Sequence, residues 1–330
     1  MFKRLLLRIL AIITSFFAYV TSLLGVNVTA TGSGRGCGGS WPLCHGQLIP
    51  DAMSIASFIE YSHRIVSGGD GLCILILTVW TWFAYKRDRL IRLLGFLSLF
   101  FVVLQGVLGA LTVVFEGTLA KNALLSFHFG FSLISFASVI LLTIRIFQLQ
   151  SGETEKSAGR PGAKVLQYGA WALAVYTYIV VYTGALVEHA GAATGCGHEV
   201  PGCGARYLPD LSSLAGIHVL HRYAAFLIWL LTLCFMVIVM RAFREHRDLL
   251  WGSCWAFLLV TLQALSGMLT VLLGEQLMIS LVHATLVSVF FAMLCYLCMQ
   301  VGWPWQRRQV VEQQVPIVPV RTQGGVGGSA

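Results

Sequence analysis

Charged side chains are scarce in this chain: Asp, Glu, Lys and Arg make up 11% of its 330 residues, against 57% hydrophobic residues. So little charge excludes a soluble globular domain, whose residues are typically about 25% charged. The sequence also lacks a C-x-x-C-H motif, which excludes covalent attachment of a c-type haem. These absences favour membrane-spanning segments and non-covalent binding of any cofactor.

Apolar runs of bilayer-spanning length recur along the chain. They cover residues 5–26, 61–84, 91–114, 123–147, 165–187, 216–240, 250–273 and 279–301. We therefore predict an all-α polytopic membrane protein with eight transmembrane helices. Lys3, Arg4 and Arg8 also allow the first run to be interpreted as a signal peptide. That run is long for a signal peptide, however, so we favour a membrane span.

The net charge of +8 is distributed in the way that membrane topology requires, and it does not indicate nucleic-acid binding. In an eight-helix arrangement, most of the 22 Lys and Arg residues fall on one side of the bilayer. The exceptions are Arg35, Arg64, Lys121, Arg206 and Arg222. The positive-inside rule then predicts a multi-pass protein of the bacterial plasma membrane with both termini cytoplasmic.

An internal duplication divides the chain. The repeated pattern is a Cys-x6-Cys loop, a Pro-Asp pair and a His-Arg pair that opens an apolar helix: Cys37, Cys44, Pro50, Asp51, His63 and Arg64, then Cys196, Cys203, Pro209, Asp210, His221 and Arg222. We predict two duplicated four-helix bundles, 1–147 and 165–301, related by a pseudo-two-fold axis along the membrane normal. The polar segment 148–164 would be a cytoplasmic linker. Residues 302–330 would form a polar cytoplasmic tail.

Histidines recur in register in the two halves. His63 matches His221, and His128 matches His283, all near the external ends of predicted helices. A single such histidine is more often interfacial than functional. Two pairs, repeated in register, favour a bundle that holds a haem iron from both faces in each half.

Arg64 and Arg222 each follow a candidate iron ligand directly. A guanidinium at that place has the forked donor geometry that suits the carboxylates of haem propionates. The alternative is that both side chains extend to lipid headgroups. We favour propionate pairing, because both copies keep the arginine.

Carboxylates distinguish the first half from the second. Glu60 stands where the second half has His218, and Asp70 stands where it has Ile228. An ionisable group inside a membrane is costly and is a functional hypothesis by default. We therefore predict a catalytic first half and an electron-relay or structural second half. The alternatives are an acid that complements a helix dipole for Glu60 and a structural hydrogen bond for Asp70.

Each external cysteine pair, Cys37 with Cys44 and Cys196 with Cys203, is predicted to form a disulfide that closes its own loop. The first pair can be a structural bridge or a redox-active one that takes part in turnover. A third possibility is copper or zinc bound by that pair together with His45.

Taken together, these motifs resemble the haem A synthase family over about residues 5–301. The resemblance rests on Gly36-Cys37, Trp41 to Gly46, Ile59 to Arg64, Ser126 to Gly130, His221-Arg222 and Val282 to Ala284. It implies an eight-helix enzyme that oxidises the C8 methyl of haem O to a formyl group through successive hydroxylations.

The resemblance also implies roles for individual residues. His63 and His128 would hold substrate haem O, while His221 and His283 would ligate a resident haem b. Glu60 would be the catalytic carboxylate, and Cys37 with Cys44 would be linked to turnover. Asp70 and His218 lie outside the family's pattern, and His218 is expected near a propionate.

The partners implied are a haem O synthase that supplies the substrate, an electron-transfer partner and the lipid bilayer, with a homo-oligomer left open. Two alternatives to the enzyme are a di-haem electron-transfer cytochrome that leaves both haems unmodified, and a haem-delivering chaperone.

Overall fold

The computed structural model describes residues 2–115, 120–152, 164–200, 202–203, 209–274 and 276–305. Within these ranges the regular structure is helical, and eight helices are long and apolar enough to cross a membrane. They are α1 (Phe2–Ala30), α2 (Ile55–Ala84), α3 (Arg89–Val114), α4 (Ala120–Ser151), α6 (Lys164–His189), α7 (Leu214–Ala242), α8 (Arg247–Leu273) and α9 (Leu277–Val301). The predicted all-α membrane architecture is confirmed.

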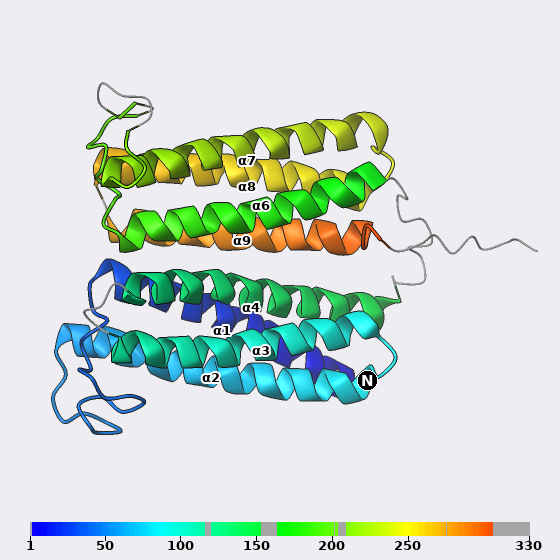
Figure 1. Cartoon of the computed structure of the whole chain (residues 1–330). Coiled ribbons are helices and arrows are strands. Elements are labelled where there is room, and N and C mark those ends of the chain that lie inside the picture. The colour runs from blue at the N-terminus through cyan, green and yellow to red at the C-terminus, as the bar shows by residue number, and fades with distance from the viewer. Residues whose placement is uncertain are drawn as a thin grey trace, which may run out of the picture.

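The helices pack in two groups of four (Figure 1). In the first group α1 packs on α2, α2 on α3, α3 on α4, and α4 on α1. In the second group α6, α7, α8 and α9 pack in the same cyclic order. Contacts of α4 with α6 and α9, and of α1 with α9, join the groups. The rotation that relates the two halves stays a prediction.

Serine caps set the start of the helices that carry the repeated His-Arg pairs. The Ser54 hydroxyl accepts a hydrogen bond from Ser57 N at the start of α2, and the Ser213 hydroxyl accepts one from Gly216 N at the start of α7. Such caps satisfy amides that have no partner within the helix. Because α2 begins at Ile55, before the apolar run at 61–84, Glu60 and His63 are helical.

The surface of the helical body is apolar. Large side chains such as Phe16, Phe83, Phe226 and Trp251 are each more than 60% exposed. Aromatic side chains in such numbers on the outside of a protein need a hydrocarbon environment. The protein is therefore a multi-pass membrane protein.

The long connections between α1 and α2 and between α6 and α7 lie at the same end of the molecule, and the N-terminus lies at the other (Figure 1). Helix α4 continues to Ser151, past the predicted start of the linker at 148. Residues 153–163 of the predicted linker, and the predicted tail beyond residue 305, lie outside the described residues.

Candidate functional site

Each of the four candidate iron ligands packs against a glycine of a neighbouring helix. A methyl group built on Gly25 of α1 would lie 3.3 Å from Cε1 of His63, and one on Gly109 of α3 would lie 3.8 Å from Cε1 of His128. In the second half, a methyl group on Gly184 or Gly267 would lie 2.9 or 3.0 Å from Cε1 of His221 or His283. The glycines thus leave space for four imidazoles inside the bundles.

The structure brings these histidines together in the predicted pairs. His63 on α2 and His128 on α4 are close enough to interact electrostatically. His221 on α7 and His283 on α9 interact in the same way. Each half therefore presents two imidazoles from two different helices, which is the donor set for an iron held from both faces.

The surroundings of the imidazoles differ between the halves. His221 Nδ1 lies 2.8 Å from the Thr183 hydroxyl, and His283 Nδ1 lies 2.8 Å from the Ser266 hydroxyl. In contrast, Nδ1 of His63 and Nδ1 of His128 are buried and have no hydrogen-bond partner within the described parts of the chain. The His128 ring does interact with the Gln105 backbone.

Two intramembrane amides connect to the same histidines. Gln105 Nε2 on α3 donates to the backbone carbonyl of His128, over 2.8 Å. Its counterpart Gln263 on α8 places Nε2 3.0 Å from Nε2 of His283. Both amides thus make interhelical hydrogen bonds, one to backbone and the other to the imidazole ring.

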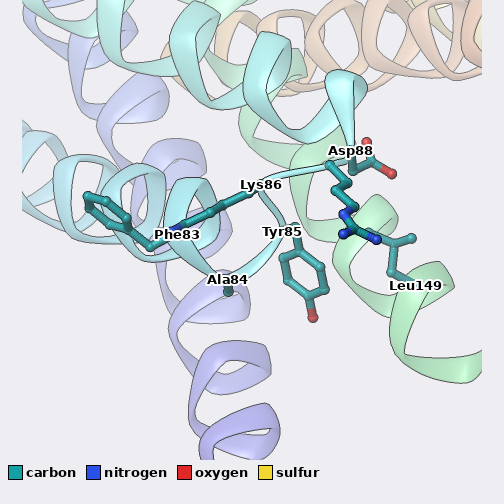
Figure 2. Close-up of a pocket in the computed structure, with 7 residues that line it drawn as sticks. Phe83, Ala84, Tyr85, Lys86, Asp88 and Leu149 are labelled. Atoms are coloured by element: carbon teal, nitrogen blue, oxygen red, sulfur yellow. The ribbon is translucent and has the colours of Figure 1, made fainter.

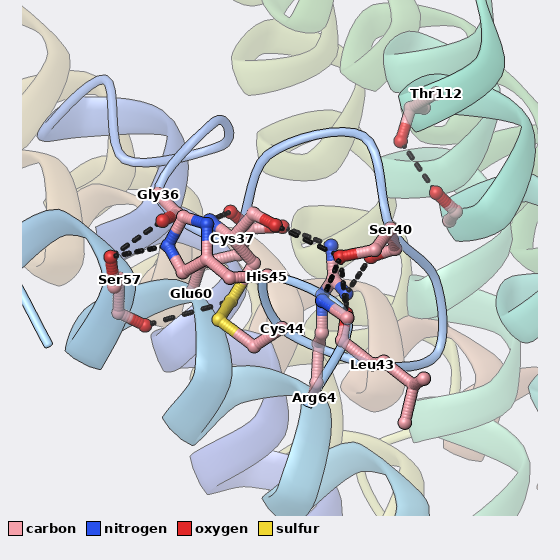
Figure 3. A network of polar contacts seen from close by, with 12 residues as sticks. Gly36, Cys37, Ser40, Leu43, Cys44, His45, Ser57, Glu60, Arg64 and Thr112 are labelled. Atoms are coloured by element: carbon pink, nitrogen blue, oxygen red, sulfur yellow. Dashed lines mark hydrogen bonds and ion pairs between the residues drawn. A yellow bond between two sulfur atoms is a disulfide. The ribbon is translucent and has the colours of Figure 1, made fainter. Parts of the chain in front are cut away.

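Glu60 is buried at the junction between α2 and the first cysteine loop (Figure 3). One carboxylate oxygen accepts a hydrogen bond from Cys37 N, over 2.9 Å, and the other pairs with the Arg64 guanidinium. The first turn of α2 contains no acidic residue. The alternative that Glu60 merely complements the helix dipole is therefore wrong, because Glu60 lies beyond that turn and has specific partners.

Arg64 also holds the cysteine loop. Its Nη1 donates to the carbonyls of Ser40 and Leu43, each over 2.8 Å (Figure 3). Arg222 repeats the arrangement in the second half, where its Nη1 donates to Gly202 O over 2.7 Å. The structure thus gives both arginines a role in loop positioning, while their pairing with propionates stays a prediction.

Both cysteine pairs are disulfides, Cys37 with Cys44 and Cys196 with Cys203. Because the first pair is oxidised, its sulfurs cannot serve as thiolate ligands. The described residues also contain no cluster of three or more His, Cys, Asp or Glu side chains that could hold a metal ion. The copper or zinc interpretation of Cys37, Cys44 and His45 is therefore wrong.

The two remaining candidates are buried. His218 is 4% exposed and interacts with the backbone of Ala192, while its Nδ1 has no hydrogen-bond partner among the described residues. Asp70 is also 4% exposed, and its Oδ1 has no partner in the same described ranges. Asp70 therefore does not make the full structural hydrogen bonding that would explain a buried carboxylate.

A separate pocket of about 540 Å³ lies at the turn between α2 and α3 (Figure 2). Phe83, Tyr85, Lys86, Asp88 and Leu149 are among its lining residues. It contains none of the candidate site residues, because this turn lies at the end of α2 opposite the cysteine loop. We therefore place the candidate site among the histidines.

The residues present fit a haem group in each half: paired imidazoles, small residues beside them and carboxylate-binding guanidinium groups nearby. Interpretation of the sequence missed the hydroxyls of Thr183 and Ser266. A comparison of the two halves in register could have found them. Each of these two residues directly precedes a glycine that packs on a histidine, and the first half has Leu24 and Leu108 at the matching positions.

The chain is also similar to known proteins. Residues 8–295 match the family described as cytochrome oxidase assembly protein. The chain is 41% identical over 290 residues to a protein named heme A synthase from Bacillus mycoides (strain KBAB4), with 88% of this chain and 91% of the relative covered. It is 38% identical over 297 residues to a heme A synthase from Halalkalibacterium halodurans, with 89% and 96% covered.

Proposed function

The chain belongs to the cytochrome oxidase assembly protein family, and on this basis we propose that it is a haem A synthase, which oxidises the C8 methyl of haem O to a formyl group. The protein is a membrane oxidoreductase that acts in the conversion of haem O to haem A. Its relatives favour this function over an electron carrier that leaves its haems unmodified. The reaction consists of successive hydroxylations of one methyl group, followed by loss of water from the geminal diol.

The substrate haem O is held in the first half by His63 and His128. The observation that supports this placement is the carboxylate of Glu60, which lies three residues before His63 on the same helix and hence on nearly the same face. The second half has His218 at that position. Glu60 assists the proton transfers that accompany this oxidation. Arg64 fixes the orientation of this carboxylate.

His221 and His283 hold a resident haem b in the second half. When bound, haem b supplies a site for one-electron transfer. His221 on α7 and His283 on α9 would hold its iron, and Arg64 and Arg222 would pair with haem propionates. His218 would lie near a propionate of haem b.

The cysteine loops face the outside of a bacterial plasma membrane, and both termini are cytoplasmic. This orientation agrees with the excess of Lys and Arg at the opposite helix ends. A haem O synthase supplies the substrate, and a separate electron-transfer partner removes electrons. A homo-oligomer would bring together lipid-facing helix surfaces of two copies.

The test is chemical identification of the pigments. The protein is coexpressed with a source of haem O and purified, and its haems are extracted with acidic acetone and identified by chromatography and mass spectrometry. Haem A or its alcohol precursor together with haem b is the expected result. Haem b alone, despite available haem O, would contradict the proposed function and favour an electron carrier.

A further inference from the structure

The second half contains a hydroxyl group beside each of its two iron-ligand candidates. The Thr183 hydroxyl on α6 lies 2.8 Å from Nδ1 of His221, and the Ser266 hydroxyl on α8 lies 2.8 Å from Nδ1 of His283. Each hydroxyl comes from the helix whose glycine packs against the same imidazole. The two contacts are therefore one arrangement that occurs twice.

Each hydroxyl also has a backbone carbonyl within hydrogen-bond distance, and this second partner indicates the direction of the hydrogen bond to the imidazole. The Thr183 hydroxyl donates to Val180 O over 2.7 Å, and the Ser266 hydroxyl donates to Gln263 O over 2.9 Å. A hydroxyl has only one proton to donate. With that proton donated to the carbonyl, each hydroxyl oxygen accepts from the imidazole, and we infer that the histidine carries its proton on Nδ1 and has its lone pair on Nε2.

The contact between Gln263 and His283 agrees with this tautomer. The side-chain nitrogen of Gln263 is a donor and lies 3.0 Å from Nε2 of His283, so Nε2 is the acceptor. A neutral imidazole with its lone pair on Nε2 and its other nitrogen hydrogen-bonded is the form that binds a metal through Nε2. For His283 to bind iron in this way, the Gln263 amide would have to leave Nε2.

The first half lacks both hydroxyls. Leu24, just before Gly25, stands where Thr183 stands before Gly184, and Leu108, just before Gly109, stands where Ser266 stands before Gly267. A leucine side chain has no acceptor. Accordingly, Nδ1 of His63 and Nδ1 of His128 have no hydrogen-bond partner in the described part of the chain.

The packing of the imidazole rings also differs between the two halves. A methyl group built on the second-half glycines would lie 2.9 and 3.0 Å from the imidazole carbons, against 3.3 and 3.8 Å in the first half. The second-half rings are thus held more closely by backbone and are oriented by a hydrogen bond. The first-half rings have more space, and their Nδ1 atoms have no hydroxyl partner among the described residues.

We propose that Thr183 and Ser266 are positioning residues that make the second-half haem permanent, and that leucine at positions 24 and 108 keeps the first-half site exchangeable. This inference rests on the proposed function, which places haem b in the second half. An enzyme that takes up one haem and releases another at one site, while it keeps a haem at a second site, needs such a difference. The structure places that difference in the groups that orient the ligands.

The first test removes one hydroxyl without changing the shape of the side chain. The holoprotein with bound haem b is compared with T183V, and transfer of haem b to apomyoglobin is followed by absorbance. We expect T183V to weaken haem b retention roughly 10–100-fold, the usual loss when a residue that orients a metal ligand is replaced. T183S, which keeps the hydroxyl, should retain haem b as the native protein does. L24V is the matched control and should leave haem b transfer unchanged.

The reduction midpoint potential of haem b gives a readout that general loosening of the bundle would not produce. Without its hydroxyl partner the imidazole becomes a weaker base, so the ferric state loses stabilisation. We expect the potential of residual haem b to shift upward in T183V and to return to the native value in T183S. If T183V still makes haem A and keeps both the native haem b retention and the native midpoint potential, the positioning role of Thr183 is overturned while the proposed function stands. Absence of haem b from the native protein would overturn the proposed function as well.

The reciprocal experiment adds the hydroxyls to the first half. The double variant L24T/L108S should copurify with a larger amount of haem O or its products than the native protein, because both first-half imidazoles then gain an acceptor at Nδ1. This result is a gain of binding, which misfolding cannot imitate. An unchanged pigment content in the correctly inserted double variant would contradict the assignment of exchangeability to Leu24 and Leu108.

Discussion

The carboxylate of Glu60 accepts a hydrogen bond from the backbone N–H of Cys37, over 2.9 Å, and so connects α2 directly to the disulfide loop. Through Arg64 the same carboxylate is joined to the carbonyl groups of Ser40 and Leu43. The candidate catalytic acid, the disulfide and the loop backbone thus form one network (Figure 3). A change in the loop will therefore alter the position of the Glu60 carboxylate, to which we assign proton transfer.

Replacing Glu60 with glutamine tests proton transfer while keeping the hydrogen-bond geometry. Glutamine retains an oxygen that can accept from Cys37 N but cannot take up a proton at neutral pH. We expect the rate of haem A formation by E60Q to fall about 10²–10⁴-fold, the usual contribution of a general acid–base group. Haem O or its hydroxylated derivative should accumulate, as measured by chromatography of extracted pigments.

The matched control for that experiment is H218Q, which alters the equivalent position of the second half. It should leave the chemical steps intact and affect at most the content of haem b. Full haem A yield from E60Q with both haems bound would exclude Glu60 as the catalytic group.

Removal of the two disulfides should have different consequences. Each closes a loop with a sequence separation of 7 residues. Loss of a disulfide typically costs about 2–4 kcal/mol of stability. We expect C37S/C44S to lose most haem A formation, because Cys37 N orients Glu60. We expect C196S/C203S to lose thermal stability in detergent but to keep activity. Equal activity losses in both variants would show that the first disulfide has no special link to turnover.

Arg64 should be irreplaceable by lysine. Its guanidinium reaches Glu60 and two backbone carbonyls at once, and a lysine ammonium lacks the fixed fork that matches these directions. Each hydrogen bond to a charged group contributes about 1.5–3 kcal/mol. We expect R64K to expose the loop 31–54 to faster hydrogen exchange, measured by mass spectrometry. Unchanged hydrogen exchange in R64K would contradict the role of Arg64 in holding the loop. R222K provides the comparison for the second loop.

The transmembrane architecture could be predicted from the sequence, because the bilayer imposes runs of apolar residues whose length is fixed by its thickness. The pairing of His63 with His128 followed from the duplication. Helix ends were less predictable: α2 begins at Ile55 rather than at residue 61, because Ser54 caps it beyond the apolar run.

Other features depend on helix rotation and on side-chain conformation, which periodicity does not fix. The hydrogen bond between Thr183 and His221 needs both helices at a particular rotation, and a threonine in an apolar span has many structural uses. The contact between Arg64 and the loop carbonyls depends on the path of an irregular segment. Sequence patterns therefore predicted the candidate ligands, while the groups that orient these histidines required the structure.

Asp70 provides the last prediction, because stability and activity should respond to its replacement in different ways. Its carboxyl group is 4% exposed on the same helix as His63, and Oδ1 has no hydrogen-bond partner among the residues described. Burial of a carboxylate without full hydrogen bonding is destabilising. If Asp70 moves protons to or from the first-half site, D70N should lower haem A formation while the thermal stability stays constant or rises.

A purely structural Asp70 would give the reverse result. D70N would then lower the melting temperature in detergent, and haem A yield per folded molecule would be unchanged. The variant D70I adds a second comparison, since Ile228 occupies the matched buried position of the second half. Isoleucine removes the carboxyl group at a position whose counterpart in the second half already holds an isoleucine side chain. A stable D70I protein with full haem A yield would eliminate the role of Asp70 in the reaction.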